Sequence, residues 1–235
     1  MTDPARDHHR REEAGMDDDE IWAAIDDQRR RTADLLEGLT GRQWERPSLC
    51  DGWTVRHVAA HLTLQQQGVR DIVVFMARHP EMLRARSLNR TIVDSAAIQA
   101  RLPTGQLVDR IRAMIGSRRH NAFVTQLETL TDILVHSQDI AVPLGAELEL
   151  PVPAAVLAAT RRWETRDTWL GKVFRRLPLE GYTLRATDAD WTRGAGPEVA
   201  GPIGALLLLV TGRTARLDEL TGAGADHLRG QRHPA

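Results

Sequence analysis

Apolar residues recur at intervals of three and four positions along most of the chain up to about residue 143, which is the repeat of an amphipathic helix packed on a core. This spacing predicts helices over residues 19–38, 54–78, 104–116 and 125–143, with a shorter helix over 89–101. In the second helix the apolar stripe continues through Val69, Ile72 and Met76, so the whole segment is expected to face the core. Pro143 is expected to end the last helix, because proline lacks a backbone N–H.

Beyond residue 145 the pattern changes to short segments separated by prolines and glycines. The predicted elements are a helix over residues 153–169, a half-buried strand over 182–187, a turn at 188–191 and a wholly apolar helix over 203–210. The order of elements predicts a mostly α fold, with a helical bundle followed by a small α+β domain. We expect the bundle to span residues 19–146 and the α+β domain residues 147–224.

The two ends of the chain are expected to lie outside this fold. Residues 1–18 contain almost no apolar side chains, which is typical of a disordered tail, and Met16 is an alternative start. Residues 225–235 are expected to form a flexible tail.

The composition of the chain limits the partners and the cellular location that we expect. Lys and Arg (31) nearly balance Asp and Glu (32), so the net charge of −1 favours neither nucleic acid nor an anionic membrane surface as a partner. The longest apolar run, residues 205–210, falls far short of the roughly 20 residues of a membrane-spanning helix, and no signal-peptide core is present. Cys50 is the single cysteine, which excludes an internal disulfide and fits a cytoplasmic location.

Three side chains have the types and spacing of an open metal site. Asp132 and His136 are four residues apart, so they lie on one helical face, and His61 belongs to another predicted helix. Two imidazole nitrogens and a carboxylate oxygen suit zinc and leave one coordination position for water or substrate. Gln65, one turn after His61, extends a polar strip along an apolar face. The alternative is that His61 is a core histidine and the other two are a hydrogen-bonded surface pair.

Five further residues each have two interpretations. His57 is a capping-box residue or a fourth candidate ligand, and Glu128 is a capping residue or a neighbour of Asp132 on the same face. Asp139 is a hydrogen-bond partner of a metal-bound histidine or a cap of the last helical turn. Cys50 is a buried structural cysteine or a reactive thiol near the metal, and Arg213 is a helix-end residue or a weak catalytic candidate in an interdomain cleft.

Three blocks of the sequence resemble the mycothiol-dependent maleylpyruvate isomerase family. They are PSLCDGWTVRHVAAHL from Pro47, LVHSQDIAVPLG from Leu134, and ATDADWTRGAGPEVAGP from Ala186 with the LLLLVTGR that follows it. The resemblance implies a DinB-like metal-binding four-helix bundle and a small carboxy-terminal domain similar to sterol carrier proteins. It also implies that His61, Asp132 and His136 are the metal ligands. The named isomerase has glutamate where this chain has Asp132, which is one methylene shorter.

The resemblance implies a function as well. The expected cofactors are a divalent metal ion, with Zn²⁺ favoured, and mycothiol as the thiol cosubstrate. The ion would activate the thiol for addition to a small electrophilic substrate, leading to isomerisation or S-transfer. Two alternatives stay open, namely a hydrolase that uses metal-bound water and a metal-binding or ligand-binding module without turnover. The expected partners are the small substrate and the low-molecular-weight thiol, and the protein is expected to be a monomer or homodimer.

Overall fold

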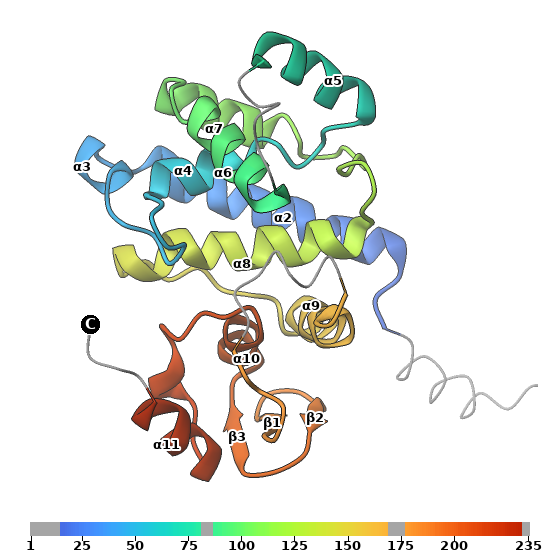
Figure 1. Cartoon of the computed structure of the whole chain (residues 1–235), viewed down its shortest axis with the longest axis vertical. Coiled ribbons are helices and arrows are strands. Elements are labelled where there is room, and N and C mark those ends of the chain that lie inside the picture. The colour runs from blue at the N-terminus through green and yellow to red at the C-terminus, as the bar shows by residue number, and fades with distance from the viewer. Residues whose placement is uncertain (1–14, 81–86, 169–176, 232–235) are drawn as a thin grey trace, which may run out of the picture.

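The computed structural model describes residues 15–80, 87–168 and 177–231. Four helices pack as a bundle, and three further helices lie around it (Figure 1). The bundle helices are α2 (Asp18–Glu37), α4 (Val55–Leu62), α7 (Thr104–Arg112) and α8 (Gln126–Leu144). The further helices are α3 (Gly41–Trp44), α5 (Val69–Arg78) and α6 (Leu88–Gln99). Most of the predicted tail over residues 1–18 lies outside the described residues, and α2 begins at Asp18.

Local capping signals set the ends of α8, which carries two of the candidate ligands. The Thr125 side chain accepts a hydrogen bond from the Leu127 amide, and Glu128 accepts bonds from the Thr125 backbone amide and hydroxyl, so the predicted capping box is present. Gly145 closes the helix in a left-handed conformation with φ 67°. Pro143 lies inside the last turn, so the helix ends one residue later than predicted.

The prediction of one continuous helix over residues 54–78 is wrong. It breaks into α4 and α5, joined by a turn at residues 63–68, and none of the side chains of α5 is buried. Val69 is 58% exposed, so the expected core stripe does not continue past the break. The reason is that the polar residues in the turn have distant partners: the Gln65 amide bonds Asp132, and the Gln67 backbone amide bonds the side chain of Asn121.

The carboxy-terminal region is a small three-stranded sheet with helices beside it (Figure 1). Strand β1 (Thr183–Ala186) lies in the middle, antiparallel to β2 (Thr192–Gly194) and parallel to β3 (Glu198–Gly201). The chain then forms α10 (Ile203–Val210), every residue of which is buried, as the apolar run predicts. The helix predicted over residues 153–169 is α9 (Val152–Thr165), and the end of the predicted segment, at Trp169, lies outside the described residues.

The flexible tail predicted from residue 225 needs a correction. After a 3-10 turn, η3 (Leu217–Glu219), the chain forms α11 (Ala223–Gly230), which packs on β3. Ala225 and Leu228 are buried, so this short helix completes the core of the small sheet. The last described residue is Gln231.

Helix α9 connects the two regions. It packs against both α8 and α10, and the buried apolar side chains of both regions belong to one contiguous core. The domain boundary between residues 146 and 147 stays a prediction, because this packing crosses it. Among the described residues, no helix combines the length and the apolar character needed to cross a membrane.

Candidate metal centre

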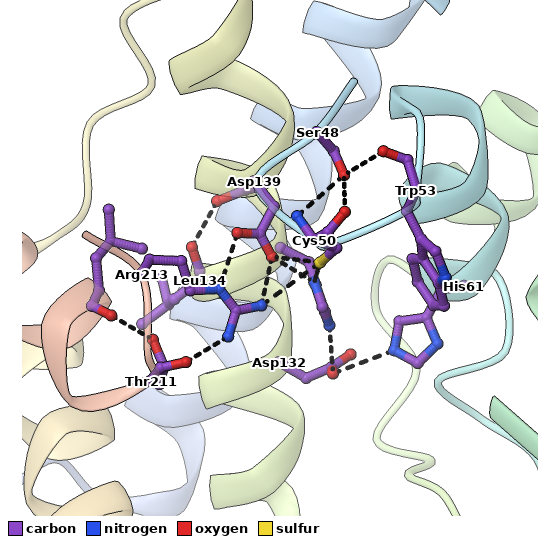
Figure 2. A network of polar contacts seen from close by, with 12 residues as sticks. Ser48, Cys50, Trp53, His61, Asp132, Leu134, Asp139, Thr211 and Arg213 are labelled. Atoms are coloured by element: carbon purple, nitrogen blue, oxygen red, sulfur yellow. Dashed lines mark hydrogen bonds and ion pairs between the residues drawn. The ribbon is translucent and has the colours of Figure 1, made fainter. Parts of the chain in front are cut away.

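Helices α4 and α8 bring the three predicted ligands together. His61 lies in the last turn of α4, and Asp132 and His136 lie one turn apart in the middle of α8. Asp132 Oδ1 is 3.3 Å from His61 Nε2 and 3.3 Å from His136 Nε2. Figure 2 shows Asp132 directed toward His61 from the neighbouring helix. One donor atom from each residue lies within 4.8 Å of the others, so the three can share a single ion.

The charges of these three residues are coupled. Burial alone would raise the pKa of Asp132, but His61 and His136 hold it well below the ordinary value. Burial would likewise lower the pKa of His136, but the Asp132 carboxylate raises it well above the ordinary value. The chain therefore holds positive charge at the point where the three donors converge. A divalent cation can supply that charge instead, and two imidazoles with one carboxylate are a donor set that fits zinc.

The other ring nitrogen of His136 faces a second polar group. His136 Nδ1 lies 2.8 Å from Asp139 Oδ2, and Asp139 is fully buried. Arg213 donates from Nε to Asp139 Oδ1 at 3.0 Å and from Nη2 to Oδ2 at 2.7 Å. Burial would raise the pKa of Asp139, but His136 and Arg213 lower it, so this carboxylate stays ionised. Of the two interpretations of Asp139, the structure shows the hydrogen bond to His136.

Arg213 has the helix-end position that one of its two interpretations predicted, and its catalytic role stays a prediction. It follows α10, where its Nη1 atom donates to the carbonyl of Thr211 at 2.7 Å, as a helix-end arginine does. The same side chain reaches across to α8 and makes the ion pair with Asp139 (Figure 2). The carboxy-terminal region thus contributes directly to the surroundings of His136.

Cys50 lies beside this second group. Its Sγ atom is 3.1 Å from Asp139 Oδ2, 3.7 Å from His136 Nδ1 and 3.6 Å from Arg213 Nη2. Cys50, His136 and Asp139 also have the types and spacing of metal ligands. The Arg213 guanidinium, however, already contacts both the thiol and the carboxylate, so a second cation there would be repelled. The thiol is half-buried and lies close to the centre.

The two remaining candidates act as caps. His57 Nδ1 lies 3.3 Å from the Thr54 backbone amide and 2.9 Å from the Thr54 hydroxyl, so His57 completes the capping box of α4. Glu128 caps α8 and pairs with Arg161 of α9. Neither belongs to the clusters of candidate metal ligands among the described residues.

Sequence reasoning missed three neighbours of the centre. The Trp53 ring lies 5.6 Å from the His61 ring, and Gln28 of α2 donates to Ser137, next to His136, at 2.8 Å. Arg29, also of α2, is fully buried. A signal for Gln28 and Arg29 was present, since both lie on the helical face that buries Ile25.

Comparisons with known proteins agree with the resemblance seen in the sequence. Residues 25–123 match the family described as the mycothiol maleylpyruvate isomerase N-terminal domain, a span that includes His61 and ends before α8. The solved structure of the mycothiol-dependent maleylpyruvate isomerase is 15% identical, with a TM-score of 0.58, and that of a histidine-to-alanine mutant is 14% identical, with a TM-score of 0.61. Each alignment covers 89% of this chain and 94% of the other. No curated protein matches this chain.

The structural likeness extends over both regions, and it confirms the predicted fold class of a helical bundle followed by a small α+β region. At this low identity it shows the fold alone. The sequence match is specific to the amino-terminal helices. Residues 25–123 of this chain therefore match the mycothiol maleylpyruvate isomerase N-terminal domain, and the chain as a whole has a fold similar to that of the mycothiol-dependent maleylpyruvate isomerase.

Proposed function

We propose that this chain is an enzyme in which a divalent metal ion, held by His61, Asp132 and His136, activates mycothiol for addition to a small electrophilic substrate. The observation that carries this proposal is the position of Asp132 Oδ1, which is 3.3 Å from the Nε2 atoms of both histidines. Zn²⁺ is the ion that these donors favour. The family relationship supports mycothiol as the thiol.

The chain's own residues would hold and orient the ion. His61 and His136 would bind the ion through neutral ring nitrogens, and Asp132 contributes one negative charge that offsets part of the ion's charge. When bound, such an ion lowers the pKa of a thiol or water in its open position. Asp139 accepts from His136 Nδ1, which leaves the Nε2 lone pair of that histidine directed toward the ion.

An external thiol is favoured over the protein's own cysteine. The Cys50 thiol is engaged by Asp139 and Arg213, on the Nδ1 side of His136. The three proposed ligands meet on the Nε2 side of the same ring. Binding of an external thiol on the Nε2 side would therefore leave the buried ion pair of Asp139 and Arg213 intact.

The proposed reaction begins with addition of the thiol to one carbon of an activated cis double bond, while the other carbon takes up a proton. The double bond becomes a single bond, about which the two carbons can rotate. Loss of the same proton and release of the thiol then restore the double bond in the trans geometry, so isomerisation consumes no thiol. If the adduct is released before elimination, the net reaction is S-transfer.

A cobalt-substituted sample tests the proposal. Addition of mycothiol should produce a sulfur-to-cobalt charge-transfer band, and 2-mercaptoethanol should do so more weakly. Cys50→Ser is the matched control, because it removes the protein thiol that could give the same band. Absence of any thiol effect with cobalt bound would contradict thiol activation, and would leave a hydrolase with metal-bound water or a non-catalytic module. Maleylpyruvate is the first substrate to assay.

A further inference from the structure

Gln65 is not one of the proposed metal ligands, but its side chain contacts one of them, Asp132. It lies in the turn after α4, where its backbone amide donates to the carbonyl of Leu62 at 3.3 Å. The residue is 3% exposed, although it occupies a place where the apolar stripe would favour leucine or valine. A glutamine buried at such a place needs hydrogen-bond partners to be stable.

The amide nitrogen of Gln65 has one strong partner. Gln65 Nε2 donates to Asp132 Oδ2 over 2.6 Å. The assignment of the amide is secure because an ionised carboxylate only accepts, so the nitrogen must face it. The other carboxylate oxygen, Oδ1, is left to face His61 Nε2 and His136 Nε2, each at 3.3 Å.

The carbonyl oxygen of the same amide accepts no hydrogen bond from the described residues. Gln65 Oε1 is buried and has no hydrogen-bond partner within the part of the chain that the structure describes. An apolar side chain would avoid this unpaired carbonyl, so packing does not explain glutamine here. Among the described residues, the hydrogen bond to Asp132 is the side-chain contact that explains a glutamine at this place.

We propose that Gln65 is a positioning residue that makes Asp132 a ligand through one oxygen. Because the amide holds Oδ2, the carboxylate cannot turn to chelate the ion with both oxygens, and one coordination position stays open for the thiol. This inference rests on the proposed metal centre, since it concerns how Asp132 binds the ion.

The test compares Gln65→Met with Gln66→Met in cobalt-substituted protein. Methionine has nearly the length of glutamine without a donor. Gln66 is the matched control, because it belongs to the same turn and its amide contacts the Met114 carbonyl at 3.4 Å rather than Asp132. With Oδ2 released in Gln65→Met, we expect a higher coordination number, seen as a weaker visible absorption of cobalt. Cobalt affinity should fall by about 10–100-fold, as is typical when a partner of a metal ligand is lost.

A second variant covers the case in which Gln65→Met does not fold. Gln65→Asn keeps the polar amide but is one methylene too short to reach Asp132, so it should give the same weakened spectrum. Parent-like spectra and affinities in both Gln65 variants would overturn the inference, and so would an equal change in Gln66→Met. Failure of the parent chain to bind cobalt would overturn the metal centre itself, so the two failures are distinguishable.

Discussion

The two ring nitrogens of His136 face two clusters, each of which contains an aspartate. The clusters differ in the side chains that lie next to that aspartate. On the Nε2 side lie His61 and Asp132, whose side chains are 17% and 25% exposed. On the Nδ1 side lie Asp139, fully buried, and Arg213, 10% exposed. The first cluster has a carboxylate whose partners are the imidazoles of two histidines. The second has a carboxylate already paired with a permanent cation.

This difference explains why one cluster suits a metal ion and the other does not. An ion on the Nε2 side displaces a proton from His136, because an imidazole, unlike a guanidinium, can lose its proton. An ion on the Nδ1 side would have to displace the guanidinium of Arg213 from Asp139, and this guanidinium keeps its charge at any ordinary pH. The second cluster is therefore better suited to hold His136 in place than to bind the ion.

Removal of a histidine from the Nε2 cluster should have the largest effect. We expect His61→Ala and His136→Ala each to lower metal affinity by more than the roughly 10–100-fold that loss of a ligand's partner costs, because each removes a direct ligand. Elemental analysis of the purified variants measures the loss, against about one ion per parent chain. His57→Ala, one turn from His61 on the same helix, is the control and should keep its metal. Full metal content in both ligand variants would contradict the site.

Substitution of Asp132 tests the charge on this side. Asp132→Asn should weaken metal binding, because the amide cannot offset the charge of the ion. Asp132→Glu should retain the metal, since a longer side chain can adjust through its rotamer and keeps the carboxylate. Competition with a chromophoric chelator gives both affinities. Equal affinity in Asp132→Asn and the parent would show that the third ligand is another residue. Maleylpyruvate isomerisation gained only in Asp132→Glu would show that ligand length tunes the reaction.

Substitutions in the Nδ1 cluster should change the free energy of unfolding more than they change metal binding. Asp139→Asn removes the charge of the buried carboxylate that pairs with the Arg213 guanidinium, and breaking a buried pair typically costs about 3–5 kcal/mol of unfolding free energy. The double variant Asp139→Asn with Arg213→Met should recover much of this stability, because no unpaired charge remains. Urea denaturation of the metal-free proteins measures both. The double variant should still bind metal about 10–100-fold more weakly, since His136 has lost its charged partner. Unchanged stability in Asp139→Asn would contradict a buried ion pair.

Parts of this arrangement follow from the sequence, because they are local. Asp132 and His136 share a face through their spacing of four, and Asp139 reaches His136 through a spacing of three. The capping roles of His57 and Glu128 follow from their places in the first helical turns. Such contacts depend on helix geometry alone, so periodicity predicts them.

Other parts depend on partners far along the chain. The periodicity of the sequence does not predict the break after α4, because Gln65 contacts Asp132 only once α4 and α8 have packed together. The contacts of Cys50 with Asp139 and Arg213 join residues 89 and 163 positions apart. Residue type limits the possible partners in such cases, but it does not select one of them.

The coupling between Asp132 and His136 predicts a pH dependence of metal binding. In the metal-free chain the carboxylate raises the pKa of His136, so this histidine keeps a proton at pH values where a free imidazole has lost it. The ion must displace that proton, and affinity should therefore rise by about tenfold per pH unit for one proton released, levelling off above the raised pKa. Calorimetry in buffers of different ionisation enthalpy counts the protons. No proton release near pH 7 would contradict the coupling.

We expect substitution of Cys50 to have the smallest effect. Its outcome distinguishes which of the two clusters binds the ion. Cys50→Ser keeps a donor that can reach Asp139, so we expect parent-like metal content and a change in unfolding free energy within about 1 kcal/mol, as for other conservative exchanges of a hydrogen-bonding group. The cobalt form without added thiol should lack a sulfur-to-metal band in both proteins, because the thiol contacts the Nδ1 side of His136. Loss of the metal in Cys50→Ser, or such a band in the parent alone, would place the ion among Cys50, His136 and Asp139. Arg213 would then have to leave the carboxylate when the ion binds, and the contrast between the two clusters would be reversed.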